Sequence, residues 1–127
     1  MAHATATIGP DRYRTSIVAG GHALTADEPA ALGGADSGPA PFDLLLASLG
    51  ACTAITLRIY AEKKGWPLER LDIDLTLSGP PEARSIARTV HPLGLNAEQA
   101  ARLADIAERT PVTLTVKAGL PIATTLI

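Results

Sequence analysis

The only cysteine of the chain, Cys52, lies in the middle of its longest apolar segment, which runs from Pro41 to Leu57. Small residues stand on both sides of the thiol: Gly50, Ala51 and Thr53. They leave space around the sulfur, which a thiol needs if a second molecule has to approach it. A buried cysteine more often serves as a small hydrophobic residue. The segment therefore makes Cys52 a candidate nucleophile, with core packing as the alternative.

The chain has 127 residues, and we expect a single domain over residues 1–127 with one core. Hydrophobic residues make up 46% of the chain and aromatic residues only 3%, which favours helices packed on a sheet around an aliphatic core. The net charge is -2 and the 11 basic residues are scattered, so a nucleic-acid partner is not expected. A lone cysteine cannot form an intramolecular disulfide and fits a reducing, cytoplasmic location.

The sequence also argues against a membrane partner. Residues 1–7 lack the basic stretch followed by an apolar stretch that marks a signal peptide. The apolar run from Phe42 to Leu57 is shorter than the roughly 20 residues that a membrane span needs, and Asp43 lies inside it. We therefore expect this run to form a buried helix of a soluble protein.

The first third of the chain predicts three short strands, at residues 4–8, 12–17 and 22–26. In the second of them Arg12 and Arg14 alternate with apolar and β-branched neighbours. The long loop at 27–40 is more often functional than idle in a compact domain. A helix should then run from Pro41 or Phe42 to about Lys64, and its first two-thirds are apolar nearly all round, so we expect burial there.

The remaining residues predict a hairpin, a second helix and a final strand. Alternating apolar residues place the hairpin strands at 71–77 and 85–91. Asn96 and Gln99 form a capping box at the start of the second helix, which should end at Thr110–Pro111. The tail is rich in β-formers. The order β-β-β-α-β-β-α-β predicts an α+β fold with antiparallel sheets.

Two stretches of this sequence, residues 32–53 and 57–68, resemble the OsmC/Ohr family of hydroperoxide-detoxifying proteins. The first, LGGADSGPAPFDLLLASLGACT, looks like the family's loop-and-helix signature, and the second, LRIYAEKKGWPL, is similar to its short YhfA-like branch. The resemblance implies the OsmC-like fold with a long buried central helix. It also implies an intertwined homodimer with active sites at the subunit interface.

The chemistry implied by the resemblance is reduction of a hydroperoxide by a thiolate, with Cys52 at the peroxidatic position. The thiolate attacks the terminal peroxide oxygen, releases an alcohol and becomes a sulfenic acid. Asp43 falls on the family's carboxylate position, where Glu is usual, and Arg12 or Arg14 could supply the family's arginine. Two residues apart on a strand, the two arginines would point to the same face. No metal or cofactor is expected, because the chain has no His- or Cys-rich insertion.

The spacing of Asp43 and Cys52 restricts how the two side chains could work together. Nine residues apart on a helix, they lie on nearly opposite faces and about 13 Å apart along the axis. If Asp43 serves a thiol, that thiol therefore belongs to the partner subunit. The alternative is that Asp43 is a first-turn carboxylate stabilised by the helix dipole.

The chain departs from the family where a second, resolving cysteine is expected, in a pattern like Arg-Cys-Pro-Val-His. Here the residues are Arg109-Thr110-Pro111-Val112-Thr113. Threonine cannot form a disulfide with a sulfenic acid, so a two-cysteine cycle is excluded and an external thiol must restore Cys52.

Three hypotheses about function arise from these residues. The first is a one-cysteine organic hydroperoxide reductase. The second is a non-enzymatic protein that binds small apolar molecules in the interfacial pocket. The third is a variant, natural or engineered, in which Cys52 performs other nucleophilic chemistry. An arginine near the sulfur with a path to solvent would favour the first, and a sealed apolar shell would favour the second.

Overall fold

The computed structural model describes residues 1–127, which form two compact units, Met1–Leu45 and Leu46–Ile127. The first unit is a three-stranded antiparallel sheet with the strand order β1-β2-β3. Its strands are β1 (Ala4–Ile8), β2 (Thr15–Ala19) and β3 (His22–Ala26). Gly20 and Gly21 connect β2 to β3 with positive φ angles of 57° and 83°, as a tight hairpin turn of type I′ requires. A short 3-10 helix, η1 (Ala30–Leu32), lies in the following loop.

The second strand is shorter than its alternating pattern predicts. It begins at Thr15, and both Arg12 and Arg14 are exposed in the loop that precedes it. The reason lies in the hydrogen bond of the intervening residue. The backbone N–H of Tyr13 donates to Asp27 Oδ1 at 3.0 Å instead of to a neighbouring strand. The expectation that the two arginines share one face of a strand is therefore wrong.

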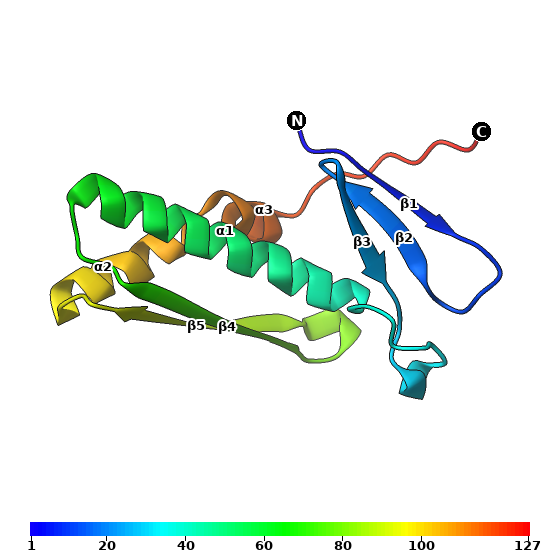
Figure 1. Cartoon of the computed structure of the whole chain (residues 1–127), viewed down its shortest axis with the longest axis horizontal. Helices are drawn as coiled ribbons and strands as arrows, with labels where there is room; N and C mark the ends of the chain where they lie inside the picture. Colours follow the sequence, from blue (N-terminus) through cyan, green and yellow to red (C-terminus); the bar gives the residue numbers. More distant parts are fainter. The chain divides into compact units, whose positions relative to one another are not determined.

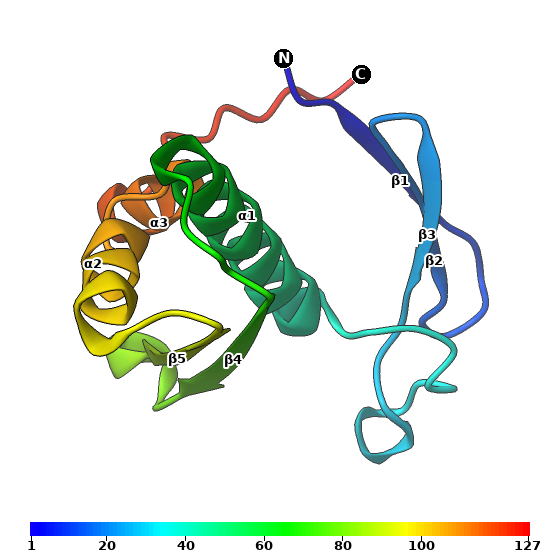
Figure 2. The same cartoon turned by 60° about the vertical axis from the view of Figure 1, so that its left-hand side comes forward.

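The second unit places three helices on one side of a β-hairpin (Figures 1 and 2). It contains most of α1 (Pro41–Lys64), the strands β4 (Arg70–Ser78) and β5 (Ser85–Leu93), and the helices α2 (Ala97–Ala107) and α3 (Pro111–Ala118). A 3-10 turn, η2 (Pro81–Ala83), lies between the two strands. Both strands alternate between half-buried and exposed residues, as expected when one face of a sheet is covered. The predicted hairpin and the predicted helix at 41–64 are confirmed.

The core of the second unit lies between the last turns of α1, the helix α2 and the hairpin. Its buried members are aliphatic: Leu57, Ala61, Leu68, Leu103 and Ala107. Partly buried residues pack around them, among them Tyr60, Trp66 and Val90. The helix α2 begins with the predicted capping box, in which Asn96 Oδ1 accepts from the N–H of Gln99 at 2.8 Å.

The helix α1 buries only one stripe of its surface within this chain. The buried residues, Leu49, Thr53, Leu57 and Ala61, are spaced by four and therefore share one face. Apolar residues elsewhere on the helix, such as Ile55 and Ile59, are exposed. The prediction that the first two-thirds of this helix are buried is therefore not met within one chain, because the hairpin and α2 cover only one side of α1.

The same helix passes a simple test for a membrane span. An 18-residue window in α1 has a mean hydropathy of 1.6, and 22% of that window is buried. By length and composition alone, the helix could cross a membrane. The core helix of a soluble protein passes the same test when something covers it. Within this chain, the apolar face of α1 that carries Ile55 and Ile59 stays uncovered.

The C-terminal segment differs from its prediction. Residues 111–118 form α3, and residues 119–127 have no regular secondary structure, so the predicted final strand is wrong. Pro111 stands at the first helical position, where its fixed φ and missing N–H cost nothing. Tertiary contacts of the buried Thr113 then outweigh the strand preference of the β-branched residues around it.

Candidate active site

The Cys52 thiol lies partly buried on α1 next to the first turn of α3. The backbone N–H of Val112 donates to Cys52 Sγ, with 3.5 Å between nitrogen and sulfur. Thr56 Oγ1, one helical turn further along α1, lies 3.9 Å from the sulfur. Val112 is the second residue of α3, and an N–H in the first turn of a helix has no partner within that helix. The sulfur of Cys52 therefore takes a donor that α3 itself leaves free.

The N-terminus of a helix carries partial positive charge, which stabilises an anion placed there. Thiolates at helix N-termini are accordingly favoured over thiols. Thr110 provides the extended N-cap position and Pro111 the first residue of α3, so these two residues aim the Val112 N–H at the sulfur. A Thr-Pro pair can follow the end of one helix or begin the next one. The sequence prediction placed Thr110–Pro111 at the end of a helix, whereas in the structure the pair begins α3. The proline at a first helical position was the signal that could have located α3.

One of the small residues next to Cys52 has a packing role. A Cβ added at Gly50 would lie 3.0 Å from Leu75 Cδ1 on β4, closer than ordinary van der Waals contact. A methyl group at Gly50 would therefore require the end of the Leu75 side chain to move by a few tenths of an ångström, so the packing of α1 on β4 favours a small residue here. This accounts for Gly50 without any need to leave space for a substrate.

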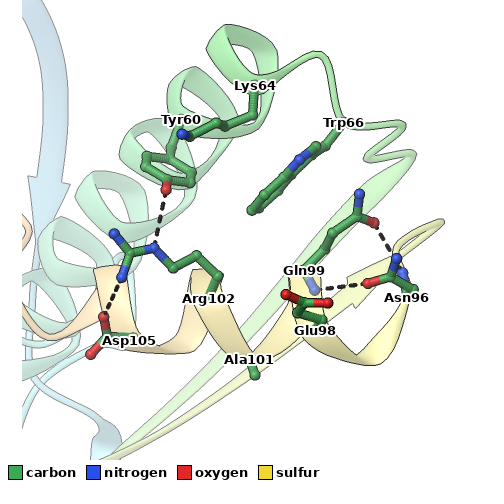
Figure 3. A pocket seen from close by; sticks show the side chains of 9 residues that line it. All are labelled: Tyr60, Lys64, Trp66, Asn96, Glu98, Gln99, Ala101, Arg102 and Asp105. Carbon is green, nitrogen blue, oxygen red and sulfur yellow. Dashed lines mark hydrogen bonds and ion pairs between the residues drawn. The ribbon is translucent and has the colours of Figure 1, made fainter.

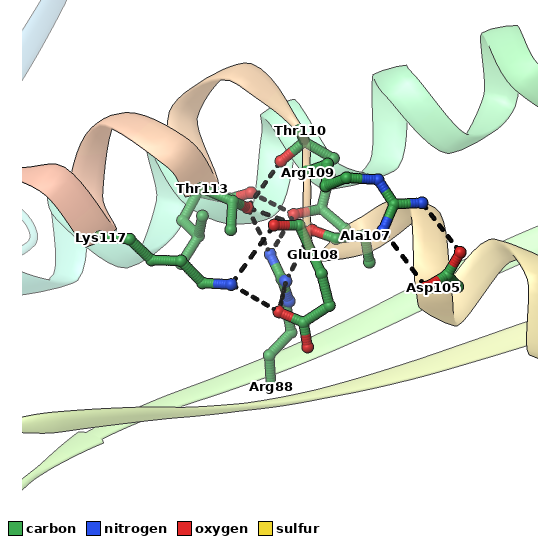
Figure 4. A network of polar contacts seen from close by, with 10 residues as sticks. Arg88, Asp105, Ala107, Glu108, Arg109, Thr110, Thr113 and Lys117 are labelled. Carbon is green, nitrogen blue, oxygen red and sulfur yellow. Dashed lines mark hydrogen bonds and ion pairs between the residues drawn. The ribbon is translucent and has the colours of Figure 1, made fainter.

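A buried polar network around Arg88 joins Thr53, the residue after Cys52 on α1, to Thr113, the residue after Val112 on α3 (Figure 4). Arg88 on β5 donates from Nη1 to Thr53 Oγ1 at 3.0 Å and to Thr113 Oγ1 at 2.8 Å, and from Nη2 to the carbonyl of Ala107 at 2.8 Å. Thr110 Oγ1 lies 2.6 Å from Thr113 Oγ1. The two hydrogen-bonding groups that lie against the sulfur itself, the Val112 N–H and the Thr56 hydroxyl, are polar, unlike the lining of a sealed apolar cavity.

Arg88 was not singled out from the sequence, although a signal was present. Along β5 it shares the half-buried face with Ile86 and Val90, and the residues between them are exposed. A charged residue at an apolar position of a strand needs buried partners. Those partners, Thr53 and Thr113, come from segments 35 and 25 residues away, which no local pattern reveals.

The other predicted site residues lie in the first unit. Asp43 is exposed in the first turn of α1, where its Oδ2 accepts from the N–H of Ala40 at 3.1 Å. This contact fits the alternative interpretation, a carboxylate that caps the helix. Arg12 and Arg14 lie in the loop between β1 and β2. Cys52 belongs to the second unit, so a role for any of these three residues at the thiol stays a prediction.

The long loop of the first unit is organised by a buried carboxylate. Asp27 is buried and accepts from the Ser37 hydroxyl at 2.5 Å and from the N–H groups of Glu28 and Ser37 at 2.7 and 3.1 Å, in addition to that of Tyr13. The Ser37 hydroxyl is the main reason that the pKa of Asp27 lies well below its ordinary value. Asp27 also lines a cavity of about 300 Å³ with Ile8 and Tyr13.

A larger groove, of about 670 Å³, lies between the end of α1 and the helix α2 (Figure 3). Tyr60 and Trp66 pack edge to face there with ring centroids 5.6 Å apart, and Arg102 Nε donates to Tyr60 Oη at 3.1 Å. Cys52 is not among the residues that line this groove. No group of three or more His, Cys, Asp or Glu side chains is placed to hold a metal ion.

Comparison with known proteins identifies a family for this chain. A family model described as OsmC-like protein matches residues 34–125. Comparison with curated proteins finds no match.

Several solved structures are similar to this chain over almost its whole length. An organic hydroperoxide resistance protein OsmC from Legionella pneumophila is 24% identical, with a TM-score of 0.72 over 92% of this chain and 89% of its own. The organic hydroperoxide resistance protein OhrB of Bacillus subtilis is 23% identical, with a TM-score of 0.65 over 92% and 90%. An OsmC-like protein from Mycoplasma pneumoniae is 20% identical, with a TM-score of 0.73 over 92% and 87%.

Proposed function

Because this chain belongs to the OsmC-like protein family, we propose that it is a one-cysteine organic hydroperoxide reductase with Cys52 as the peroxidatic nucleophile. The observation that carries the proposal is the hydrogen bond from the Val112 N–H to Cys52 Sγ. A partly exposed sulfur at the N-terminus of α3 combines access with stabilisation of negative charge. The names of the Legionella and Bacillus proteins support an organic hydroperoxide as the substrate class.

In the proposed reaction the thiolate of Cys52 attacks the terminal oxygen of the hydroperoxide. The new S–O bond forms as the O–O bond breaks, and the leaving alkoxide takes up a proton to become an alcohol. The sulfur loses two electrons and the peroxide gains them. The Val112 N–H is placed to stabilise the negative charge on the sulfur before the attack.

Regeneration requires thiols from outside the chain, because Thr110 stands at the position of the family's second cysteine. A first external thiol condenses with the sulfenic acid to a mixed disulfide and releases water. A second external thiol releases Cys52 and leaves with the first as a disulfide. A cytoplasmic location would supply such thiols.

The proposal includes a homodimer in which the uncovered face of α1 meets a second copy. Ile55 and Ile59 are 59% and 47% exposed and lie one and two turns beyond Cys52 on α1. A second copy seated there would cover these apolar side chains together with the thiol. Asp43, and Arg12 or Arg14, would then act on the thiol of the partner subunit.

The Val112 N–H at the sulfur favours the reductase over the binding protein, since it stabilises a negative charge that a small apolar ligand does not carry. Intact-mass measurement after one equivalent of cumene hydroperoxide tests the choice directly. The wild type should gain one oxygen atom, and Cys52→Ser should gain none. A wild-type chain that keeps its free thiol would contradict the proposed function. Consumption of peroxide in the presence of dithiothreitol then measures turnover.

A further inference from the structure

The guanidinium of Arg88 is attached to all three helices of the second unit. Its Nη1 bonds the hydroxyl of Thr53 on α1 and that of Thr113 on α3, and its Nη2 bonds the last carbonyl of α2, that of Ala107. The carbonyls of the last turn of a helix lack partners within it and attract cations. A single side chain from the sheet therefore holds α1, the end of α2 and the start of α3 in one arrangement.

Arg88 is held by hydroxyls and a carbonyl and has no close carboxylate. Its side chain is 12% exposed, and the nearest acidic oxygen, Glu108 Oε2, is 4.0 Å away on a side chain that is 60% exposed. That oxygen lies 2.8 Å from Lys117 Nζ. A guanidinium is costly to bury without an ionic partner. The place of Arg88 among the half-buried residues of β5 is therefore supported by these three hydrogen bonds, which an aliphatic residue could not make.

The two threonines that Arg88 binds are the sequence neighbours of the two residues that make the thiol contact. Thr53 follows Cys52 on α1, and Thr113 follows Val112 on α3. The distance between Cys52 Sγ and the Val112 N–H depends on the relative position of α1 and α3. The Nη1 group of Arg88 fixes that relative position, because its two hydrogens reach one hydroxyl on each helix.

We propose that Arg88 is a positioning residue for Cys52: by joining Thr53 to Thr113 it holds the first turn of α3 where the Val112 N–H reaches the sulfur. Arg88 need not touch the sulfur or the substrate. The charged groups around this network are Arg88 itself, Glu108 after the end of α2, Lys117 on α3 and the exposed ion pair of Asp105 with Arg109. The inference deepens the proposed function, but it concerns the reactivity of the thiol, which is measurable without any peroxide.

The test is the rate at which iodoacetamide alkylates Cys52 in the folded protein across a range of pH, followed by intact mass. Because the chain has one cysteine, every added mass reports on this thiol. Arg88→Met removes the donors at similar length, Arg88→Lys keeps the charge but lacks the second nitrogen that binds the Ala107 carbonyl, and Thr113→Val removes the attachment to α3. Arg70→Met and Thr115→Val make the same changes at exposed positions and serve as matched controls.

We expect Arg88→Met and Thr113→Val to lower the alkylation rate at neutral pH roughly tenfold, the equivalent of one lost hydrogen bond to a charged group. Their rates at high pH should equal that of the wild type, because the accessibility of the sulfur is unchanged. Arg88→Lys should restore part of the neutral rate, and both controls should follow the wild-type profile.

A merely structural role for Arg88 predicts the opposite sign. Loosened packing would expose the thiol and raise the alkylation rate at every pH, together with a lower melting temperature. Such a result, or a profile identical to that of the wild type in a folded Thr113→Val protein, would overturn the proposal even if Arg88→Met does not fold. If cumene hydroperoxide leaves wild-type Cys52 as a thiol while the alkylation profiles shift as expected, the reductase proposal fails and the positioning role of Arg88 stands.

Discussion

In the proposed function, the side chain of Thr110 determines the fate of Cys52 after its first oxidation. It is fully buried and its hydroxyl is engaged with Thr113, so it has neither a thiol nor a free hydroxyl to offer a sulfenic acid. The oxidised sulfur must wait for a small thiol from solution. An excess of peroxide competes with that thiol and drives the sulfur to sulfinic acid, which ordinary thiols do not reduce.

Repeated doses of hydroperoxide should therefore inactivate the wild-type protein, and excess dithiothreitol should protect it. Intact mass should show two added oxygen atoms on the inactivated chain and none on Cys52→Ser treated alike. Full activity after many doses without any thiol present would contradict this expectation, since it would require a resolving group inside the protein.

Replacement of Arg12 or Arg14 tests whether a loop arginine stabilises the thiolate. If one of them serves Cys52, its alanine variant should need a higher pH for half-maximal alkylation by iodoacetamide, by roughly one pH unit for a close opposite charge. The other alanine variant is the internal control, because both arginines are exposed in the same loop. Profiles equal to that of the wild type in both variants would remove the arginine from the mechanism.

At the scale of elements, α1 and the hairpin could be predicted because their signals are local. The apolar run from Pro41, the glycine after Lys64 and the alternation from Leu71 to Leu77 each lie within one element. The helix α3 was missed because its composition favours a strand, and the contacts of Thr113 that override this preference come from distant segments. The same holds for Arg88, whose role depends on three helices that meet only in the folded chain.

The loop after β3 should depend on the charge of Asp27. The pKa of this carboxyl is held below its ordinary value of 3.8, chiefly by the Ser37 hydroxyl, so the ionised form stabilises the folded state. The stabilisation is fully present above pH 3.8 and is lost as the pH falls toward the lower pKa of the folded protein.

Asp27→Asn should accordingly lower the melting temperature at neutral pH by several degrees, because an amide cannot accept all four hydrogen bonds. Below pH 3.8 the difference from the wild type should narrow. Asp11→Asn, in the exposed loop between β1 and β2, is the control. A difference in melting temperature that stays constant down to strongly acidic pH would show that the charge of Asp27 contributes nothing.

At the scale of the whole molecule, the one-sided burial of α1 is the feature that a single chain leaves unexplained. Contiguous exposed apolar residues on a long helix mark an interaction surface. The family and the α+β fold class were predictable from the sequence because the loop-and-helix signature is contiguous. The separation into two compact units was not, since α1 bridges their boundary without any break in its sequence pattern.

Light scattering at micromolar concentration should give the mass of a dimer for the wild type. Ile55→Lys should shift the protein toward the monomer, because it places a charge on the apolar face beside Cys52. Glu82→Lys introduces the same residue at an exposed position of η2, outside α1, and should stay dimeric. A monodisperse wild-type monomer would rule out the shared interface.

The network around Arg88 also acts as a fixed electrostatic environment. Its hydrogen-bond acceptors are two hydroxyls and a peptide carbonyl, none of which gains or loses a proton near neutrality. The nearby acids, Glu108 and Asp105, stay ionised because Lys117 and Arg109 hold their pKa values below the ordinary ones. The network that sets α1 against α3 thus carries the same charge at mildly acidic pH as at mildly alkaline pH, so the contact between the Val112 N–H and Cys52 Sγ does not depend on the protonation of its supports.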